Sequence, residues 1–412
     1  MPKNYSKEDL LLNEKERRNL SILETIRRFG PISRPAISEN LGLNVVTISH
    51  YVDNFLRKNL VVETSLAVSE GGRRPLLLDL NPQGGYTIGI GVNLLNIVAL
   101  LIDAKGNILQ KVQLDVDINS PSDILGKILD ITRKIIQRSK EYVDRIKGIG
   151  LAVAGLVNKH NGTVCWPQRT SPKEYNYISV DIPLAEMLEK EFGLPVLVDN
   201  DATCACFGEN WFDKERHWEN VLYMFSGVGC GMILNGKLYR GSLGYAGEVF
   251  IHNYKEMNLF QCNLGNSCFL KCWEYDLGIL EEIKKRLSIE KDVGQQILDL
   301  AQNKIENISL RTVFNAYRIK NLLAEEVVNK AAQRLGIKAA FLVNFLNPEV
   351  LILGGGVEEA GNEFLKVFIR ALRDWAFYVN TENLKIIYSK LRENACAYGA
   401  AALMMENFFA NI

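Results

Sequence analysis

Residues 31–55 read PISRPAISENLGLNVVTISHYVDNF, and this stretch predicts two short helices joined by a tight turn. Ser33 and Asn44 each precede a helix, where their side chains can accept hydrogen bonds from unpaired backbone N–H groups. Gly42 suits the turn, because glycine adopts the left-handed conformation without steric cost. Apolar residues recur at helical spacing in the second helix and are expected to face inward. They are Ile48, Val52 and Phe55.

A further helix precedes this segment, and a hairpin follows it. The helix is indicated by an apolar stripe formed by Leu20, Leu23 and Ile26. Residues 60–62 and 76–78 read as two strands, and the turn between them contains Gly-Gly-Arg-Arg-Pro at 71–75. Residues 1–80 therefore predict a winged helix-turn-helix of the α+β type.

The second helix of the pair presents small and polar side chains near its start, as a helix in the major groove requires. Val46 suits a thymine methyl group, while Ser49 and His50 suit base edges or phosphates. Glycines beside Arg73 and Arg74 would let both guanidinium groups approach a narrow minor groove. The predicted DNA-contacting residues are Arg34, Asn44, Val46, Thr47, Ser49, His50, Arg73 and Arg74. The alternatives are a three-helix interaction module and a solvated basic turn; the two features together favour DNA binding.

The length and composition of the chain limit the number of domains and the class of protein. Its 412 residues exceed one compact core, so two or three domains are expected. No stretch approaches the roughly 20 apolar residues that span a bilayer, and the N-terminus does not resemble a secretory signal, so we expect a cytoplasmic protein without membrane partners. Residues 1–74 contain twelve basic and nine acidic residues, a surplus compatible with DNA binding but too small to establish it.

A compositional break at residues 81–85 predicts a linker. Beyond it, segments with helix and strand periodicity alternate, which favours an α/β architecture. A strand-rich run covers residues 86–110 with a turn at 103–107, and apolar runs at 146–153 and 195–198 predict buried strands.

Ordered motifs along most of the chain resemble those of the repressor/open-reading-frame/kinase (ROK) family, in its xylose-repressor-like branch. They include GGRRP, Gly148 to Gly155, Val198 to Ala202, the glycine loop at 224–232, Cys272-Trp273-Glu274, Gly354-Gly355-Gly356 and Tyr398 to Ala401. The resemblance implies an actin-like ATPase (ribonuclease-H-like) fold of two lobes, at 86–205 and 206–412, with a sugar site in the cleft between them.

The resemblance also identifies a phosphate loop that has lost its ligands. Family kinases use Asp-x-Gly-Gly-Thr near the first strand, and the matching residues here are Gly91 to Leu95. The carboxylate, both glycines and the hydroxyl are all replaced. Because Mg²⁺ prefers hard oxygen ligands and phosphoryl transfer depends on positioning and charge neutralisation, bound ATP and Mg²⁺ are not expected.

The sugar site is implied by the same resemblance. Asp201 matches the general base of the kinases, and a carboxylate there can instead accept hydrogen bonds from a bound sugar. The implied sugar-binding residues are Asn200, Asp201, Glu248, His252 and Glu274.

Family members carry a structural zinc site of one His and three Cys in the loop that corresponds to residues 248–274. The matching ligands here are His252, Cys262, Cys268 and Cys272, a set that suits tetrahedral zinc. Leu264 replaces a second Cys of the family pattern, and His252 is displaced by one residue. Two interpretations therefore stand: a structural Zn²⁺, or a buried thiol cluster without metal.

These features predict a DNA-binding transcriptional regulator, a repressor of carbohydrate-metabolism genes, controlled by a sugar effector. Palindromic half-sites would call for a homodimer or homotetramer. An ATP-dependent sugar kinase carrying a DNA-binding domain is the main alternative. A sugar-independent DNA-binding scaffold is the other, because residues 175–177 depart from the family pattern.

Overall fold

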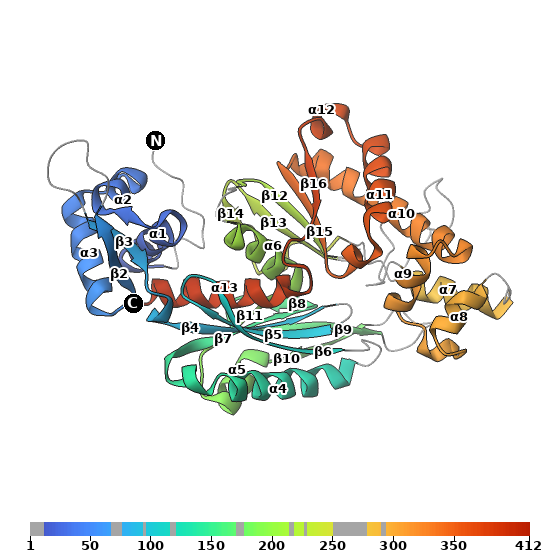
Figure 1. Ribbon diagram of the computed structural model, residues 1–412, viewed down its shortest axis with the longest axis horizontal. Helices are drawn as coiled ribbons and strands as arrows, with labels where there is room; N and C mark the ends of the chain where they lie inside the picture. The colour runs from blue at the N-terminus through green and yellow to red at the C-terminus, as the bar shows by residue number, and fades with distance from the viewer. Residues whose placement is uncertain are drawn as a thin grey trace.

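Two five-stranded sheets and a smaller unit at the N-terminus make up the described part of the protein (Figure 1). The computed structural model describes residues 12–66, 76–93, 96–115, 121–169, 177–213, 218–225, 229–249, 278–289 and 294–412.

The N-terminal unit contains, within the described residues, three helices and a three-stranded sheet. These are α1 (Glu14–Phe29), β1 (Ile32–Ser33), α2 (Arg34–Leu41), α3 (Val45–Arg57), β2 (Val61–Leu66) and β3 (Leu76–Leu80). The predicted caps are confirmed: the Ser33 side chain accepts from the backbone N–H of Ala36, and the Asn44 side chain from that of Val46. Gly42 ends α2 with a φ of 63°. In the sheet, β3 pairs antiparallel with both β1 and β2.

The predicted inward faces of these helices form the core of the unit. From α1, Leu23 and Ile26 are fully buried, while Leu20 is only partly buried at its edge. The three apolar residues predicted to face inward from α3 are also fully buried: Ile48, Val52 and Phe55. The spacing of apolar residues therefore predicted the packing correctly.

The first sheet has the strand order β11-β7-β4-β5-β6. Its strands are β4 (Tyr86–Val92), β5 (Asn96–Asp103), β6 (Ile108–Asp115), β7 (Ile146–Val153) and β11 (Val196–Asn200). The predicted strand at 146–153 coincides with β7, and the one at 195–198 is β11, which continues to Asn200. Because β4, β5 and β7 are buried almost throughout, their sequences are nearly continuous apolar runs.

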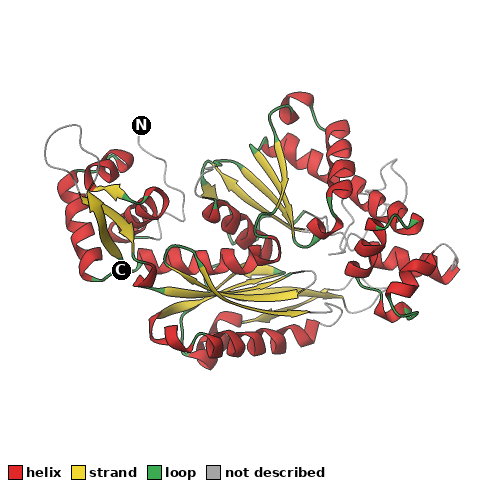
Figure 2. Cartoon of the chain, in the orientation of Figure 1, coloured by secondary structure: helices red, strands yellow, loops and turns green. Residues whose placement is uncertain are grey.

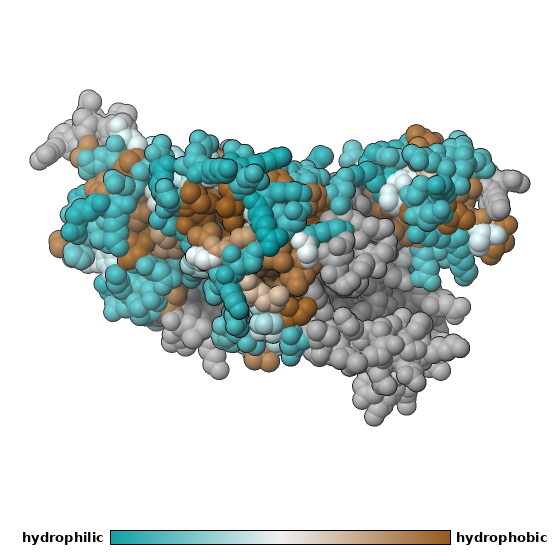
Figure 3. Space-filling view, turned by 90° about the horizontal axis from the view of Figure 1, so that it is seen from below, coloured by the Kyte–Doolittle hydropathy of each residue, from teal (hydrophilic) through white to brown (hydrophobic). Residues whose placement is uncertain are grey.

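Helices cover both faces of this sheet, as Figure 2 shows. On one face lie α4 (Pro121–Arg138) and α5 (Leu184–Phe192), and on the other lies α13 (Ala395–Ala410). A small antiparallel sheet of β8 (Leu156–Asn158), β9 (Thr163–Arg169) and β10 (Tyr177–Ile182) joins β7 to α5. Figure 3 views the side on which α4 and α5 lie; hydrophilic residues dominate the described surface at both ends, and hydrophobic ones gather between them.

The second sheet has the order β14-β13-β12-β15-β16. Its strands are β12 (Val221–Phe225), β13 (Gly229–Leu234), β14 (Lys237–Leu238), β15 (Val350–Gly354) and β16 (Lys385–Tyr388). The helices of this half are α7 (Ile279–Ile289), α8 (Gln295–Leu300), α9 (Leu310–Arg318), α10 (Leu322–Leu346), α11 (Asn362–Trp375) and α12 (Tyr378–Thr381). Helices α10 and α11 pack against each other, α7, α9 and α12 contact α10, and α8 contacts α9. None of the described helices combines the length and hydropathy that a membrane span requires.

Two helices pack against each other between the sheets. Helix α6 (Asp201–Phe212) lies on β12 and β13 of the second sheet, whereas α13 lies on β4 and β7 of the first. Their backbones touch at Gly208 and Gly399: a Cβ on Gly399 would lie 1.7 Å from the Cys204 carbonyl oxygen. Only glycine permits so close a contact, and the two sheets are thereby held together through one helix pair.

Candidate functional site

The junction between β11 and α6 places Asn200 and Asp201 at the end of a buried strand. Asn200 is the N-cap of α6: its Oδ1 accepts from the Thr203 backbone N–H at 3.1 Å. Its Nδ2 donates to the Gly155 carbonyl oxygen at 3.3 Å. The Asn200 amide therefore fixes the first turn of α6 against the segment that follows β7, and it orients the neighbouring Asp201.

Asp201 is buried and carries an unusually basic carboxyl group. Only 5% of the residue is exposed, and its Oδ1 accepts from the Ala202 backbone N–H at 2.7 Å. Burial raises the pKa of Asp201 to about 6, because a charged carboxylate loses its hydration there. No cation of the described residues contributes to this shift.

Glu248 is half-buried and lies close enough to Asp201 to interact with its charge. It forms an isolated antiparallel bridge with Gly229, and a Cβ on Gly229 would lie 3.3 Å from the Ala202 Cβ. Burial and the negative charge of Asp201 raise the pKa of Glu248 to about 7. The structure thus brings together two residues that the sequence predicted as sugar contacts, and we call this pair the Asp201–Glu248 site.

Two adjacent carboxyl groups of this kind suit a neutral polyhydroxylated ligand. A carboxylate accepts hydrogen bonds, and a protonated carboxyl also donates one, so the pair matches hydroxyl groups of either orientation. A phosphate would instead be repelled by the same charges. The site therefore fits a sugar better than an anion.

An ion pair beneath the site was not predicted from the sequence. Asp199 Oδ2 accepts from Arg240 Nε at 2.8 Å, with side chains 5% and 17% exposed. Arg240 follows β14 and so joins the end of β11 to the second sheet. Because 41 residues separate the partners, only the fold reveals the contact.

The described part of the loop that corresponds to the phosphate loop of kinases is held by internal contacts. Asn93 is buried, and its Nδ2 donates to Asn96 Oδ1 at 2.9 Å and to the Glu393 carbonyl oxygen at 2.8 Å. Gly91 lies against the start of α13: a Cβ there would be 2.4 Å from the Ala397 backbone nitrogen. Leu94 and Leu95 lie outside the described residues.

A pocket of about 330 Å³ adjoins this loop, and acidic side chains line much of it. We call it the Asn93 pocket; its lining includes Asn93, Asn96, Arg318, Gly356, Glu358, Glu359, Arg392 and Glu393. Arg318 donates to the Glu359 carbonyl oxygen. Burial raises the pKa of Glu358 to about 7. The lining thus combines three carboxyl groups with two arginines.

The predicted DNA-contacting residues lie mostly on the outer surface of the N-terminal unit. Val46 is 76% exposed, Asn44 and His50 are exposed, and Thr47 and Ser49 are half-buried on α3. Asn44 also serves as the helix cap. These exposures leave the start of α3 accessible, as a recognition helix requires.

The remaining candidates are engaged elsewhere or lie outside the described residues. Arg34 forms an ion pair with Asp53 at 2.7 Å and keeps 30% of its side chain exposed. Arg73, Arg74, His252 and Glu274 lie outside the described residues, as do the remaining zinc candidates, which are Cys262, Cys268 and Cys272. The described residues hold no group of three or more His, Cys, Asp and Glu able to bind a metal, so the zinc site stays a prediction.

Comparison with known proteins assigns the chain to a family. The ROK family profile matches residues 86–407. The xylose repressor of Bacillus spizizenii is 30% identical over 94% of this chain and 94% of its own length. The xylose repressor of Caldicellulosiruptor bescii is 29% identical over 96% and 97%. The transcriptional dual regulator NagC of Escherichia coli is 22% identical over 95% and 92%.

Solved structures share the fold. A ROK family transcriptional regulator, a homologue of the E. coli Mlc protein, has a TM-score of 0.68 at 24% identity and covers 96% of this chain and 97% of its own. A ROK family glucokinase from Streptomyces griseus has a TM-score of 0.62 at 25% identity, covering 77% and 99% respectively. The two sheets thus form the actin-like, sugar-kinase type of fold, and the chain belongs to the ROK family.

Proposed function

We propose that this protein is a sugar-responsive transcriptional regulator, a repressor of carbohydrate-metabolism genes. The observation that carries the proposal is the similarity to xylose repressors over nearly the full length, N-terminal unit included. The match to the glucokinase, in contrast, covers 99% of the glucokinase but uses only 77% of this chain. The N-terminal unit is thus a feature that this protein shares with the regulators.

The N-terminal unit acts as a winged helix-turn-helix over residues 1–80, joined by the linker at 81–85 to lobes at 86–205 and 206–412. Helix α3 enters the major groove through Val46, Ser49 and His50, and Arg73 and Arg74 contact the minor groove beside it. Selection from a pool of random double-stranded DNA tests this function. Recovery of a palindromic sequence whose binding weakens with salt is expected, and failure to enrich any sequence would contradict it.

The effector is a sugar held at the Asp201–Glu248 site, with Asn200 holding the first turn of α6 in place. The names of the relatives make D-xylose the first candidate and N-acetylglucosamine the second. A thermal-shift series with these sugars, D-glucose and other monosaccharides tests the site, because a ligand that binds the folded state raises its Tm. No shift with any sugar would contradict this part of the proposal.

Catalysis is not part of the proposed function, although Asp201 is present and buried as a kinase general base would be. The Asn93 contacts hold the described part of the corresponding loop, and residues Gly91 to Leu95 supply neither a carboxylate nor a hydroxyl for Mg²⁺ and phosphate. A coupled assay for ADP release with the same sugars should give no turnover above background. Sustained turnover would instead favour a sugar kinase that carries a DNA-binding unit.

The protein acts as a homodimer or homotetramer, so that two copies of α3 meet two half-sites. A patch of large apolar side chains on α10, α11 and α12 supports self-association, because monomers rarely expose such patches. Its most exposed members are Phe345, Phe377, Tyr378 and Val379, each at least 70% exposed. Light scattering should show a smaller particle for Phe345→Glu and no change for Ile289→Glu, a matched variant on α7.

A further inference from the structure

Helix α6 connects the Asp201–Glu248 site to the N-terminal unit. It begins at Asp201 and ends at Phe212, and its twelve residues span about 18 Å at 1.5 Å per residue. Figure 1 shows the N-terminal unit beside the far ends of α6 and α13. One helix therefore has sugar-site residues in its first turn and a contact with the N-terminal unit in its last.

The contact at the far end of α6 is a cluster of Glu24 and Arg27 from α1 with Trp211. The Arg27 guanidinium lies 3.9 Å from the centroid of the Trp211 ring, and its Nη1 donates to the Trp211 carbonyl oxygen at 2.9 Å. Glu24 accepts from Arg27 Nε at 2.8 Å and from Trp211 Nε1 at 3.2 Å. The Arg27 side chain is only 7% exposed, so the stacking and charge interactions are little weakened by water.

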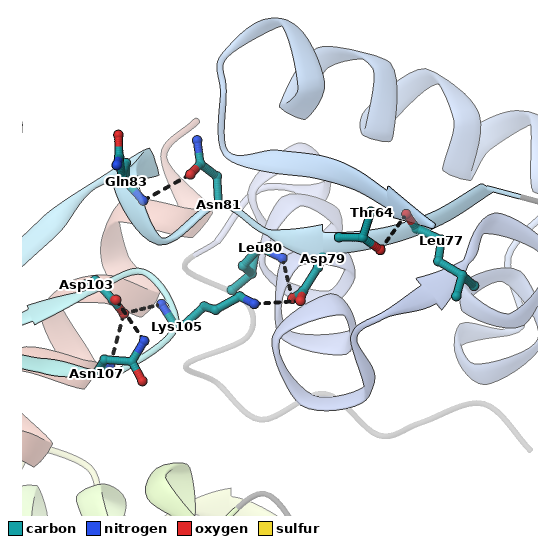
Figure 4. Close-up of polar contacts among 9 residues, drawn as sticks. All are labelled: Thr64, Leu77, Asp79, Leu80, Asn81, Gln83, Asp103, Lys105 and Asn107. Atoms are coloured by element: carbon teal, nitrogen blue, oxygen red, sulfur yellow. Dashed lines mark hydrogen bonds and ion pairs between the residues drawn. The ribbon is translucent and has the colours of Figure 1, made fainter. Parts of the chain in front are cut away.

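The N-terminal unit is attached separately to elements of the first sheet. Asn19 of α1 is fully buried, and its Nδ2 donates to the Ala410 carbonyl oxygen at the end of α13, at 3.1 Å. Figure 4 shows Lys105, from the turn between β5 and β6, in an ion pair of 2.5 Å with Asp79 of β3. The unit thus touches α6, which packs on the second sheet, and also α13 and a turn of the first sheet.

A change in the angle between the two sheets would therefore move or strain the N-terminal unit. The sheets meet through α6 and α13, whose backbones touch at Gly208 and Gly399. A rotation about this contact would displace Trp211 relative to Ala410, and the unit is held by both. A pocket of about 240 Å³ beside the cluster, lined by Arg27, Arg28 and Trp211 among others, gives these side chains room to rearrange.

We propose that α6 transmits the sugar signal to the DNA-binding unit, and that Trp211 and Arg27 are the positioning residues that receive it. The inference rests on the proposed function and adds the route by which the two sites are coupled. A sugar bridging Asp201 and Glu248 draws the first turn of α6 toward the second sheet. The Glu24–Arg27–Trp211 cluster then rotates α1 and the rest of the N-terminal unit. This rotation changes the spacing between the α3 helices of the two copies.

The test measures the factor by which a saturating sugar changes operator affinity, using fluorescence anisotropy with the selected DNA. Arg27→Lys keeps the positive charge but loses the planar guanidinium that stacks on Trp211 and hydrogen-bonds to Glu24 and the Trp211 carbonyl oxygen. Trp211→Phe loses the hydrogen bond to Glu24. Arg18→Lys, in an exposed pair with Glu14 on the same helix, is the control. We expect a wild-type factor of about 5 to 150, kept by the control and reduced to about 2 or less by both variants.

Two further measurements separate this role from structural damage. Calorimetry should show sugar affinity within about twofold of wild type in Arg27→Lys and Trp211→Phe without DNA, because neither residue touches the site. By thermodynamic reciprocity, operator DNA should change the sugar affinity by the same factor in the wild type and by about 2 or less in both variants. Variants that retain the wild-type factor, or that lose sugar binding itself, would overturn the inference alone. A wild type whose operator affinity no sugar changes would contradict the proposed function, and the inference with it.

Discussion

Asp201 and Asn93 both lie next to the start of α13, yet their surroundings differ in kind. Asp201 is buried and lies near the half-buried Glu248, and the backbone oxygen of Asp201 accepts from the Cys396 thiol in the first turn of α13 at 3.6 Å. Asn93 uses its amide to close its own loop onto Asn96 and Glu393. The first region keeps the two carboxyl groups to which we assign sugar binding, whereas Asn93 in the second uses its amide for contacts within the protein. Under the proposed function, this fold has kept sugar recognition and lost phosphate recognition.

The largest expected effect is a loss of sugar affinity at the Asp201–Glu248 site. Asp201→Asn removes the charged acceptor and should weaken sugar binding by about 10- to 150-fold, the range for a hydrogen bond to a charged group. Calorimetry measures the affinity. Asp130→Asn, in an exposed pair on α4, should bind sugar as the wild type does. Equal affinity in Asp201→Asn and wild type would remove Asp201 from the site.

Restoring at Gly91 the carboxylate that family kinases carry should destabilise the protein rather than restore phosphate transfer. In Gly91→Asp the new Cβ would lie 2.4 Å from the Ala397 backbone nitrogen, so β4 and α13 must separate. We expect a loss of about 2–3 kcal/mol of stability, seen as a lowered Tm, and no ADP release. A variant of wild-type Tm that phosphorylated a sugar would show that this region is still a kinase site.

A smaller effect is expected where Asn93 closes the loop. Asn93→Ala leaves Asn96 Oδ1 and the Glu393 carbonyl oxygen without this donor, at a cost of about 1–2 kcal/mol. Thermal unfolding should register the loss, while sugar affinity stays within about twofold of wild type. A marked fall in sugar affinity would mean that the two regions are not separate.

A further effect concerns pH. The pKa values of Asp201 and Glu248, about 6 and about 7, lie above the ordinary values of 3.8 and 4.5, so the folded state favours their protonated forms. This stabilisation is complete below the ordinary values and is lost as pH rises through 6 to 7. Between pH 5 and pH 8 the Tm of the sugar-free protein should fall, and Glu248→Gln should reduce that fall by on the order of a few degrees. An identical pH dependence in both proteins would contradict the proposed pairing of the carboxyl groups.

Local sequence signals predicted much of the fold. Ser33, Gly42 and Asn44 cap or end their helices as expected, because capping depends on residues within a few positions. The strand at 146–153 was placed correctly because an uninterrupted apolar run leaves few alternatives.

Local signals of this kind do not predict contacts between residues that are far apart in the sequence. The Asp199–Arg240 pair and the Glu24–Arg27–Trp211 cluster join segments 41 and more than 180 residues apart. Arg34 shows the same limit at shorter range, since its pairing with Asp53 depends on how α2 packs on α3. Family resemblance implied that Asp201 and Glu248 each contact the sugar, and the bridge between Glu248 and Gly229 shows how the fold brings Glu248 toward the first turn of α6.

The effect that we propose for a sugar at the Asp201–Glu248 site is a change in how α3 binds DNA. Its most direct measurement is a titration of the selected operator by the full chain, followed by fluorescence anisotropy, with and without each sugar of the series. We expect one sugar to change the operator Kd by about fivefold or more, ATP with Mg²⁺ to change nothing further, and Asp201→Asn to abolish the effect at the same sugar concentration. Operator binding that no sugar alters, or a sugar effect that survives in Asp201→Asn, would contradict it.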